Sequence, residues 1–446
     1  MLDGRRPSQK RRSALWASRK LVDGRTAARD ARKVLNDGRN QRGPHALDRV
    51  RDMTAAADLV FVTNIPTPYR TAFFNKLGEV CDERGIRFHV LYCARTEPRR
   101  SWLFNPDENA YSYEFLRGWS PTIGGVTFPI NPGILGRLAS LAPQVVVHAG
   151  SWNMPTNLLA LTGNRPGGGR LFWSEGHSGA VIHAAGPIAA IRRRVLSGYD
   201  GFVIPNSASR DWIQAQLPQA NRCHILPNTV DEEFYRRRGD DERPEARRAL
   251  NLHINERVIV QVGYLEELKG ALELAQAFAD APPELRKGAR LVFVGGGTQS
   301  KDIGQIARSL SGVGTIQLTG DLPGRDVRRW LMAADIFALN TKRDRNPLTP
   351  VEASFASLPL LLSSFAGNVA ELVEERVTGF VIPDPLVPTS QLQMFLRTSA
   401  DEIRRMGVNA RLNVDAHFTR RYAAETFLDG LSESLVSISP EQSSLQ

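Results

Sequence analysis

The chain has 446 residues, more than one hydrophobic core usually supports, so two domains are expected, and its 42% of hydrophobic residues allow both to be globular. No uncharged apolar run reaches the roughly 18 residues that a membrane-spanning helix needs, which argues against an integral membrane protein. Of the formal charge of +10, residues 1–52 carry +9, so the rest of the chain is nearly neutral and a nucleic-acid-binding protein is disfavoured.

Residues 1–52 are predicted to be a basic, mostly disordered extension, because they are rich in Arg and Lys and lack apolar periodicity. Three interpretations stay open: a solvated extension, a segment that contacts anionic lipid at the inner face of the membrane, and a natural start at Met53. The three cysteines have neither ligand-like nor disulfide-like spacing, which is typical of a cytoplasmic protein; they are Cys81, Cys93 and Cys223.

Residues 53–235 alternate short apolar runs with helical patterns, which indicates a parallel α/β sheet. A helix is expected at 69–83. Strands are expected at 58–65, 87–93, 144–148, 171–174, 201–205 and 223–227. A polar, charge-rich linker is predicted at 236–256.

Residues 257–415 repeat the pattern and predict a second α/β domain, with strands at 257–263, 290–294, 315–318, 335–339, 360–363 and 379–382. Residues 416–446 are expected to form a C-terminal helix that packs back on the first domain, followed by a tail. Two such Rossmann-like domains would face each other across a cleft at the C-terminal ends of their strands, where open α/β sheets bind ligands.

The second domain carries a predicted phosphate site. Gly263 ends one strand, and Lys269 follows at the start of the next helix. Backbone N–H groups at a helix N-terminus and an ammonium group both attract phosphate, so a nucleotide diphosphate would bind there. The turn beginning at Gly295 ends the next strand, and Leu322 follows the one after it. Taken alone, Lys269 could be a solvated lysine and the glycines an ordinary tight turn.

Asp344 and Glu352 stand eight positions apart around the start of a helix, with Leu348 and Thr349 between them. A loop and the first helical turn after it can aim both carboxylates into one cleft, where they would grip sugar hydroxyls. The structural alternative is that Thr349 and Glu352 form a capping box, and that Asn368 caps the following helix in the same way with Glu371.

The order of these segments resembles glycosyltransferase family 4, which comprises retaining, nucleotide-sugar-dependent enzymes of the group 1 type with the GT-B fold. The pair at 344 and 352 is similar to the family's Glu-x7-Glu signature, and residues 263–270 are similar to its Gly-Arg-Leu-x-x-x-Lys-Gly loop. The resemblance extends to Met406-Gly407-x-Asn409-Ala410-Arg411. This sequence departs from the family at two positions, where Tyr264 replaces the Arg and Asp344 replaces the first Glu.

The resemblance implies an enzyme that moves a sugar from a nucleotide-diphosphate sugar to a glycan or lipid-linked acceptor, in surface polysaccharide or glycoconjugate biosynthesis. It implies that Glu352 binds the ribose, Lys269 the diphosphate and Asp344 the transferred sugar. The positive charge missing at position 264 is expected from Lys342, Arg343 or Arg345, or from Arg70 across the cleft. Arg70 and Arg345 are therefore candidate contacts of the acceptor or a phosphate.

In the first domain, Arg70 follows a loop stiffened by two prolines, and Glu175 and His177 follow another strand end. Glu175 and His177 are expected to bind or deprotonate the acceptor hydroxyl, and together with Asp344 they are the candidate catalytic residues. The structural alternatives are a solvated Arg70 and a satisfied structural His177. Trp152, at a third strand end, would stack on a sugar or simply pack.

No Asp-x-Asp motif or His/Cys/Asp cluster has metal-ligand spacing, so a metal-independent enzyme without a cofactor is expected, with the nucleotide sugar as donor substrate. Two alternatives from other classes remain. A nucleotide-sugar epimerase of the same fold would bind the donor without an acceptor, and a non-catalytic relative would bind it without transfer.

Overall fold

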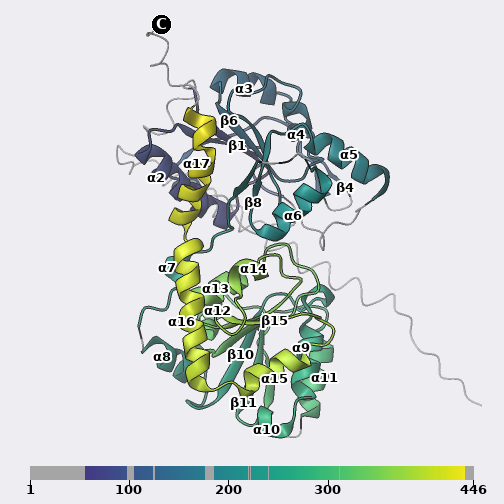
Figure 1. Ribbon diagram of the computed structural model, residues 1–446, viewed down its shortest axis with the longest axis vertical. Helices are drawn as coiled ribbons and strands as arrows, with labels where there is room; N and C mark the ends of the chain where they lie inside the picture. The colour runs from purple at the N-terminus through teal and green to yellow at the C-terminus, as the bar shows by residue number, and fades with distance from the viewer. Residues whose placement is uncertain are drawn as a thin grey trace, which may run out of the picture. The chain divides into compact units, whose positions relative to one another are not determined.

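The computed structural model describes residues 56–97, 105–123, 126–175, 185–218, 220, 222–239, 241–310 and 312–436. These residues build two parallel α/β sheets, which are shown in Figure 1. The basic extension at 1–52 and Met53 lie outside the described residues, so the predictions made for them stay predictions.

The first sheet contains seven parallel strands among the described residues, in the order β3-β2-β1-β6-β7-β8-β9. The strands are β1 (Leu59–Thr63), β2 (Phe88–Tyr92), β3 (Ser112–Phe115), β6 (Val145–Ala149), β7 (Gly169–Trp173), β8 (Gly201–Ile204) and β9 (Cys223–Ile225). A short antiparallel pair, β4 (Thr122–Ile123) and β5 (Val126–Thr127), stands apart from the sheet.

Alternate residues of the first sheet pack against helices on opposite faces. Leu59 and Phe61 of β1 face α2 (Pro68–Glu83), whereas Val60 and Val62 face α3 (Ile134–Leu141) and α4 (Pro155–Ala160). Further along the sheet lie α5 (Gly186–Leu196) and α6 (Ser207–Gln216), and a short 3-10 turn, η2, spans Pro106–Glu108. Burial on both faces explains why these strands are continuously apolar.

The second sheet contains six parallel strands within the described ranges, in the order β12-β11-β10-β13-β14-β15. They are β10 (Arg257–Val262), β11 (Ala289–Val294), β12 (Thr315–Leu318), β13 (Ile336–Leu339), β14 (Leu360–Ser363) and β15 (Gly379–Ile382). The accompanying helices are η4 (Glu267–Lys269), α9 (Ala271–Ala279), α10 (Pro283–Arg286), α11 (Ser300–Ser309), α12 (Gly324–Ala333), α13 (Thr349–Phe355), α14 (Val369–Leu372), α15 (Thr389–Arg397) and α16 (Ala400–His417).

The expected α/β architecture with two Rossmann-like domains is confirmed, and each expected strand is present with its ends within two residues of the prediction. The edge strand β3 and the β4–β5 pair were not predicted. Residues 112–115 are only partly buried, because an edge strand packs on one side, and they therefore lack the continuous apolar run of the inner strands.

The last helix, α17 (Arg420–Val436), packs on the first domain beside α2, at the left of Figure 1. Ala423, Ala424, Phe427, Leu428 and Leu431 are buried in the same apolar cluster as β1 and α2. The C-terminal segment thus completes the core of the domain that the N-terminal half of the chain begins.

The segment predicted as a linker is folded onto the second domain. It follows α7 (Glu232–Tyr235) and contains α8 (Glu242–Ala249). Ala246 of α8 and Leu252 after it are buried in the same apolar core as residues of α12. Arg247 is 1% exposed, and its guanidinium donates to the backbone oxygens of Ala333 and His253 at 2.8 and 3.0 Å. The sequence of α8 is rich in Arg and Glu and therefore looked like a polar linker. A charged residue can be buried only when it is paired, and the partners of Arg247 are backbone oxygens of residues outside α8.

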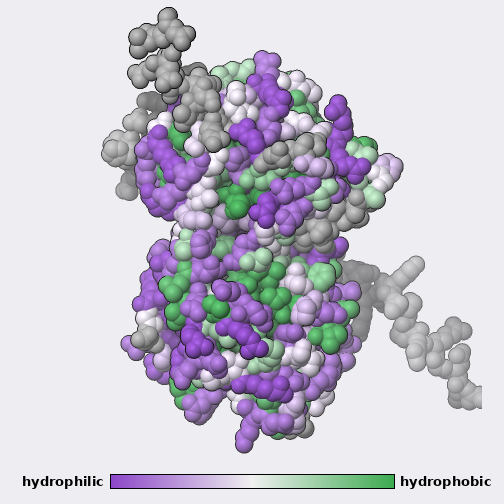
Figure 2. All heavy atoms as spheres, in the orientation of Figure 1, coloured by the Kyte–Doolittle hydropathy of each residue, from purple (hydrophilic) through white to green (hydrophobic). Residues whose placement is uncertain are grey.

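No helix of the described part of the chain is long and apolar enough to cross a membrane. On the face seen in Figure 2, hydrophilic residues predominate and hydrophobic residues form small areas between them.

Candidate active site

The carboxyl ends of β10 and β13 lie side by side in the second sheet, and the loops that follow them carry the central residues of the predicted donor site. The chain continues from β10 to β11 in one direction and from β13 to β14 in the other. Open α/β sheets bind ligands at such a reversal of strand order. Gly263 and Lys269 lie in the loop after β10, and Asp344 lies in the loop after β13.

Hydrogen bonds hold these two loops together. The carbonyl oxygen of Leu268 accepts from the Lys342 N–H and from Thr341 Oγ1, both at 2.8 Å. Asn340 Nδ2 donates to Gly270 O at 3.1 Å. Gly270 has a φ of 61°, and a Cβ there would lie 1.9 Å from Asn340 O, so the close approach of the loops requires glycine.

Lys269 and Asp344 form an ion pair between the two loops, with the ammonium bonded to Asp344 Oδ2. The Lys269 side chain is 30% exposed and that of Asp344 16% exposed. The backbone of Asp344 is fixed from the other side, since its N–H donates to Phe365 O at 3.2 Å and its carbonyl accepts from the Gly367 N–H at 2.9 Å. A carboxylate and an ammonium are therefore held at the sheet edge, where both can reach a bound molecule.

The glycines of the two adjacent loops are needed for backbone packing. Gly263 and Gly295 both have a φ of 137°, and a Cβ on Gly295 would lie 2.2 Å from Gly263 O. A Cβ on Gly297 would lie 2.5 Å from Leu265 O. The tight-turn alternative therefore accounts for Gly295 and Gly297 without a ligand, while the turn keeps the loop of Lys269 in place.

Glu352 lies in the first turn of α13, where the capping-box alternative is not realised. The N-cap residue is Leu348, one position earlier than predicted, and no side chain caps the helix. Glu352 instead forms a hydrogen bond with the Tyr235 hydroxyl. Burial raises the pKa of Glu352 to about 7, against the lowering effect of that bond. Tyr235, from α7 in the segment next to the predicted linker, was missed as a site residue.

Leu322 and Leu348 are partly buried and pack on the same apolar cluster as Tyr235. Leu322 follows β12, and Thr349 is the first residue of α13. Leu322 and Leu348 thus add apolar surface to the cluster that contains Tyr235, the hydrogen-bond partner of Glu352.

The cations expected to replace the family's Arg at position 264 differ in whether another residue of the chain already binds them. Tyr264 is 70% exposed. Lys342 is paired with Glu273 of α9 at 2.5 Å and so is already neutralised. Arg343 and Arg345 are exposed, and neither side chain has a hydrogen-bond or ion-pair partner among the described residues. They are therefore the cations free to meet a diphosphate, and the assignment of that role to Lys342 is disfavoured.

Arg70 belongs to a polar cluster in the first domain. Its Nη1 donates to Thr63 Oγ1 at 2.8 Å, and its guanidinium lies 4.9 Å from the ring centre of Trp173. Burial acts to lower the pKa of Arg70, but Tyr69 and Glu175 outweigh it and raise the pKa. Arg70 is thus held inside the first domain, and it is neither the solvated residue of the alternative nor a cation reaching across to Tyr264.

A small pocket at the strand ends of the first domain is lined by Arg70, Trp173 and Asn228. Asn228 Nδ2 donates to Glu175 Oε1 at 3.3 Å, which joins Glu175 to this cluster. Arg70 Nε, Trp173 Nε1 and Asn228 Oδ1 are buried and have no hydrogen-bond partner within the described chain. Two donors and one acceptor complement a hydroxyl group, which accepts two hydrogen bonds and donates one.

His177 lies outside the described residues, so its predicted role stays a prediction. Trp152 is partly buried and packs on the apolar cluster of β8 and α6, which supports the packing alternative for this residue.

Hydrogen bonds join the first domain to the loop of Arg345. Asn206 Nδ2 donates to Arg345 O and to Asn346 Oδ1, both at 3.2 Å. The backbone N–H of Ser207, at the start of α6, donates to Glu371 Oε1 at 2.6 Å. Asn368 makes no capping bond to Glu371, and the predicted box is therefore absent. Glu371 binds a helix of the other domain instead, a role that no local sequence pattern indicates.

The second domain is similar in sequence to known proteins. Residues 242–409 match the family described as Glycosyl transferases group 1. TuaC of Bacillus subtilis, named as a teichuronic acid biosynthesis glycosyltransferase, is 30% identical over 190 residues, which cover 43% of this chain and 40% of TuaC. Sulfoquinovosyl transferase SQD2 of Arabidopsis thaliana is 25% identical over 199 residues, 44% of this chain and 37% of the relative. The chain thus spans about two fifths of the length of these curated relatives.

The crystal structure of Anabaena HepE in complex with UDP has the same fold, with a TM-score of 0.62 at 14% identity over 84% of this chain and 100% of HepE. The GT-B architecture expected from the sequence is confirmed. The match of residues 242–409 supports the expected similarity to group 1 glycosyltransferases. The matched residues 242–409 contain Lys269, Asp344 and Glu352. They begin at α8, in agreement with the packing of that helix on the second domain.

Proposed function

We propose that this protein is a family 4 glycosyltransferase that moves a sugar from a nucleotide-diphosphate sugar to an acceptor, without a metal or other cofactor. The observation that carries the proposal is the Lys269–Asp344 pair at the reversal of strand order, inside the segment that matches group 1 glycosyltransferases. The binding of UDP by HepE, which has the same fold, supports a nucleotide donor.

In the proposed donor complex, Lys269 binds the diphosphate and Asp344 accepts hydrogen bonds from the transferred sugar. Lys269 and Asp344 already form an ion pair, so Asp344 partly neutralises the ammonium that binds the diphosphate. Arg343 and Arg345, which are exposed on the same loop, then supply the charge that Tyr264 does not. The negative charge that builds up on the leaving diphosphate is stabilised by Lys269, Arg343 and Arg345.

The nucleoside is proposed to bind beside α13. The Glu352 carboxyl accepts hydrogen bonds from the ribose hydroxyls, and the apolar surface of Leu322 and Leu348 contacts the base. Gly263 and Gly295 keep the two adjacent loops close to the diphosphate. Thr349, at the first residue of α13, lies within the same turn as Glu352.

The acceptor is proposed to place a hydroxyl in the pocket of Arg70, Trp173 and Asn228, because the unpartnered atoms there complement one. Glu175, and His177 outside the described residues, would then lie on the acceptor side. Asp344 is paired with Lys269 and is a poor nucleophile, which favours attack by the acceptor on the face that the diphosphate leaves, with retention. The leaving phosphate would take the acceptor proton.

The class of acceptor is proposed from the relatives, one of which is named for teichuronic acid biosynthesis and the other as a sulfoquinovosyl transferase. We propose a glycan or lipid-linked acceptor, used at the inner face of the membrane, with residues 1–52 contacting anionic lipid. Vesicles containing an anionic lipid should retain the full chain and not a chain that begins at Met53. Equal retention of the two chains would rule out the lipid contact.

Thermal shift measurements with nucleoside diphosphates and their sugars test the donor site. A ligand at about one hundred times its Kd stabilises the folded protein by about 2.7 kcal/mol, which raises the unfolding temperature by several degrees. The shift should be absent in Glu352→Ala and retained in Glu374→Ala, which removes an exposed carboxylate from the same domain. If no nucleotide stabilises the unchanged protein, the proposed function is wrong. Donor consumption without an added acceptor would point to an epimerase.

A further inference from the structure

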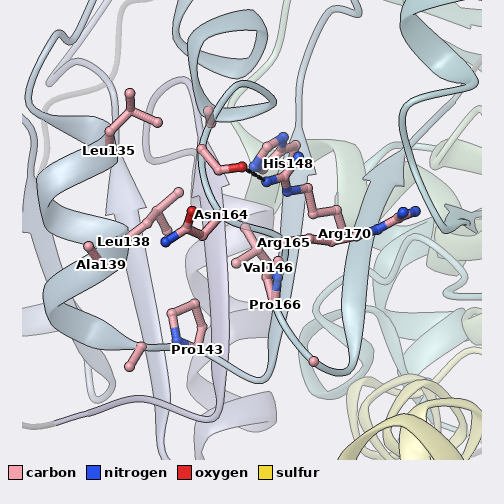
Figure 3. Close-up of a pocket in the computed structure, with 14 residues that line it drawn as sticks. Leu135, Leu138, Ala139, Pro143, Val146, His148, Asn164, Arg165, Pro166 and Arg170 are labelled. Atoms are coloured by element: carbon pink, nitrogen blue, oxygen red, sulfur yellow. Dashed lines mark hydrogen bonds between the residues drawn. The ribbon is translucent and has the colours of Figure 1, made fainter.

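A cavity of about 540 Å³ lies in the first domain between α3, the end of α4 and strands β6 and β7, as Figure 3 shows. Pro143 and Gly167, which precede β6 and β7, are part of its lining. The cavity is therefore near the amino ends of these strands, whereas Arg70 and Glu175 lie beyond the carboxyl ends. Its volume is in the range of small-molecule sites, about 300–1,000 Å³.

Most of the wall is apolar. Leu135 and Leu138 of α3 face Val146 of β6. Ala160 of α4 is also part of the lining. No Asp or Glu is among the lining residues that the structure describes. A bound molecule would therefore place most of its surface against aliphatic side chains.

His148 of β6 is fully buried at this cavity, and one of its ring nitrogens is unused. Nδ1 lies 3.0 Å from the Tyr199 hydroxyl, and Nε2 has no partner within the described residues. In the tautomer that carries its hydrogen on Nε2, Nδ1 accepts from the Tyr199 hydroxyl. Burial and the nearby Arg170 lower the pKa of His148 to about 3, so the ring is a neutral donor. A buried donor without an acceptor is costly unless a ligand or water uses it.

Arg170 of β7 adds positive charge beside His148. Its Nη1 donates to Leu161 O at 2.7 Å, and its Nη2 donates to Gly163 O along the dashed line in Figure 3. Arg165 is turned toward Asp200, with which it is paired. The guanidinium of Arg170 is thus fixed by carbonyl oxygens, and the corner it shares with His148 favours a negatively charged acceptor.

We propose that this cavity binds a small carboxylate with an apolar body, the carboxylate accepting from His148 Nε2–H beside Arg170 and the apolar body lying against α3 and β6. This ligand is distinct from the donor and acceptor of the proposed glycosyl transfer, and its site is built entirely from the first domain.

Calorimetric titration with octanoate, and with 1-octanol as its uncharged counterpart, tests the proposal on the full chain. Octanoate should bind saturably at one site, and 1-octanol about tenfold more weakly, because it lacks the charge that strengthens the bond to the buried donor. The ring-nitrogen NMR signals of His148 should report the Nε2–H tautomer and shift when octanoate is added. Equal binding of the two probes would overturn the carboxylate assignment.

Two pairs of variants locate the site. Ala139→Phe fills the cavity from the exposed side of α3 and should abolish octanoate binding, whereas Ser140→Phe adds the same ring outside the lining and should not. His148→Gln keeps an amide near the position of Nε2 and should bind, whereas His148→Asn, which can only replace Nδ1, should bind octanoate no better than 1-octanol. Absence of saturable binding, or binding unaffected by Ala139→Phe, would refute the proposal even if His148→Asn failed to fold.

Discussion

Replacing Glu352 by Gln should make the protein more stable at alkaline pH while removing donor binding. The Glu352 carboxyl has a pKa of about 7 in the folded chain against 4.5 for an ordinary Glu, chiefly because of burial. The folded state therefore holds a proton that the unfolded state has lost between these two pH values. Stability falls as pH rises through this window, since the folded state binds more protons there.

The size of the effect follows from the two pKa values. Each pH unit between 4.5 and about 7 costs 1.36 kcal/mol, so ionisation of Glu352 reduces the free energy of unfolding by up to about 3 kcal/mol above pH 7. Gln keeps the shape and can still bond to the Tyr235 hydroxyl, but it carries no charge. Glu352→Gln should therefore equal the unchanged protein near about pH 4.5 and exceed its stability by up to about 3 kcal/mol near about pH 8.

Urea unfolding at both pH values measures the difference, and titration with UDP at the higher pH measures donor binding. Glu374→Gln, at an exposed position of the same domain, is the matched control and should change neither quantity. If Glu352→Gln is no more stable than the unchanged protein at the higher pH, the carboxyl is not held against ionisation and the reasoning fails. If it still binds UDP with full affinity, Glu352 is not the ribose acceptor.

Lys269→Ala should weaken UDP binding by about 2 kcal/mol, roughly thirtyfold, because it removes a charged hydrogen bond and leaves Asp344 facing the phosphates. Calorimetry should show a much smaller loss of affinity for uridine, and an equal loss would contradict the role of Lys269 at the diphosphate. Gly270→Ala should lower the free energy of unfolding by about 2 kcal/mol or more, because the added Cβ would lie 1.9 Å from Asn340 O and Gly270 has a φ of 61°. An unchanged unfolding midpoint would be inconsistent with the packing of the two loops. Arg70→Lys loses the stacking on Trp173 and should raise the KM for the acceptor without changing UDP affinity, and a changed UDP affinity would place Arg70 in the donor site instead.

The fold was predictable because its strands are buried on both faces and so are continuous apolar runs, which a sequence displays directly. The donor-side residues were predictable for a related reason, since the loop of Lys269 and the loop of Asp344 both follow such strands. The edge strand at 112–115 escaped prediction because it is only half covered and carries no such run.

Other features depend on contacts between distant parts of the chain. Nothing local to Tyr235 indicates that its hydroxyl meets Glu352 far along the sequence. The same holds for Glu371, whose local pattern suggested a helix cap although its partner is the N–H of Ser207 in the other domain. Arg247 made a folded helix look like a linker because its carbonyl partners are supplied by the tertiary structure.

The position of α17 has a consequence for the order in which the protein matures during synthesis. The ring centroids of Phe427 and Phe61 of β1 lie 5.7 Å apart, so a helix that follows the second domain in sequence supplies part of the core around β1. Domains generally fold as units as they emerge. The apolar face of the first domain that α17 covers can therefore be buried only after α17 has been translated.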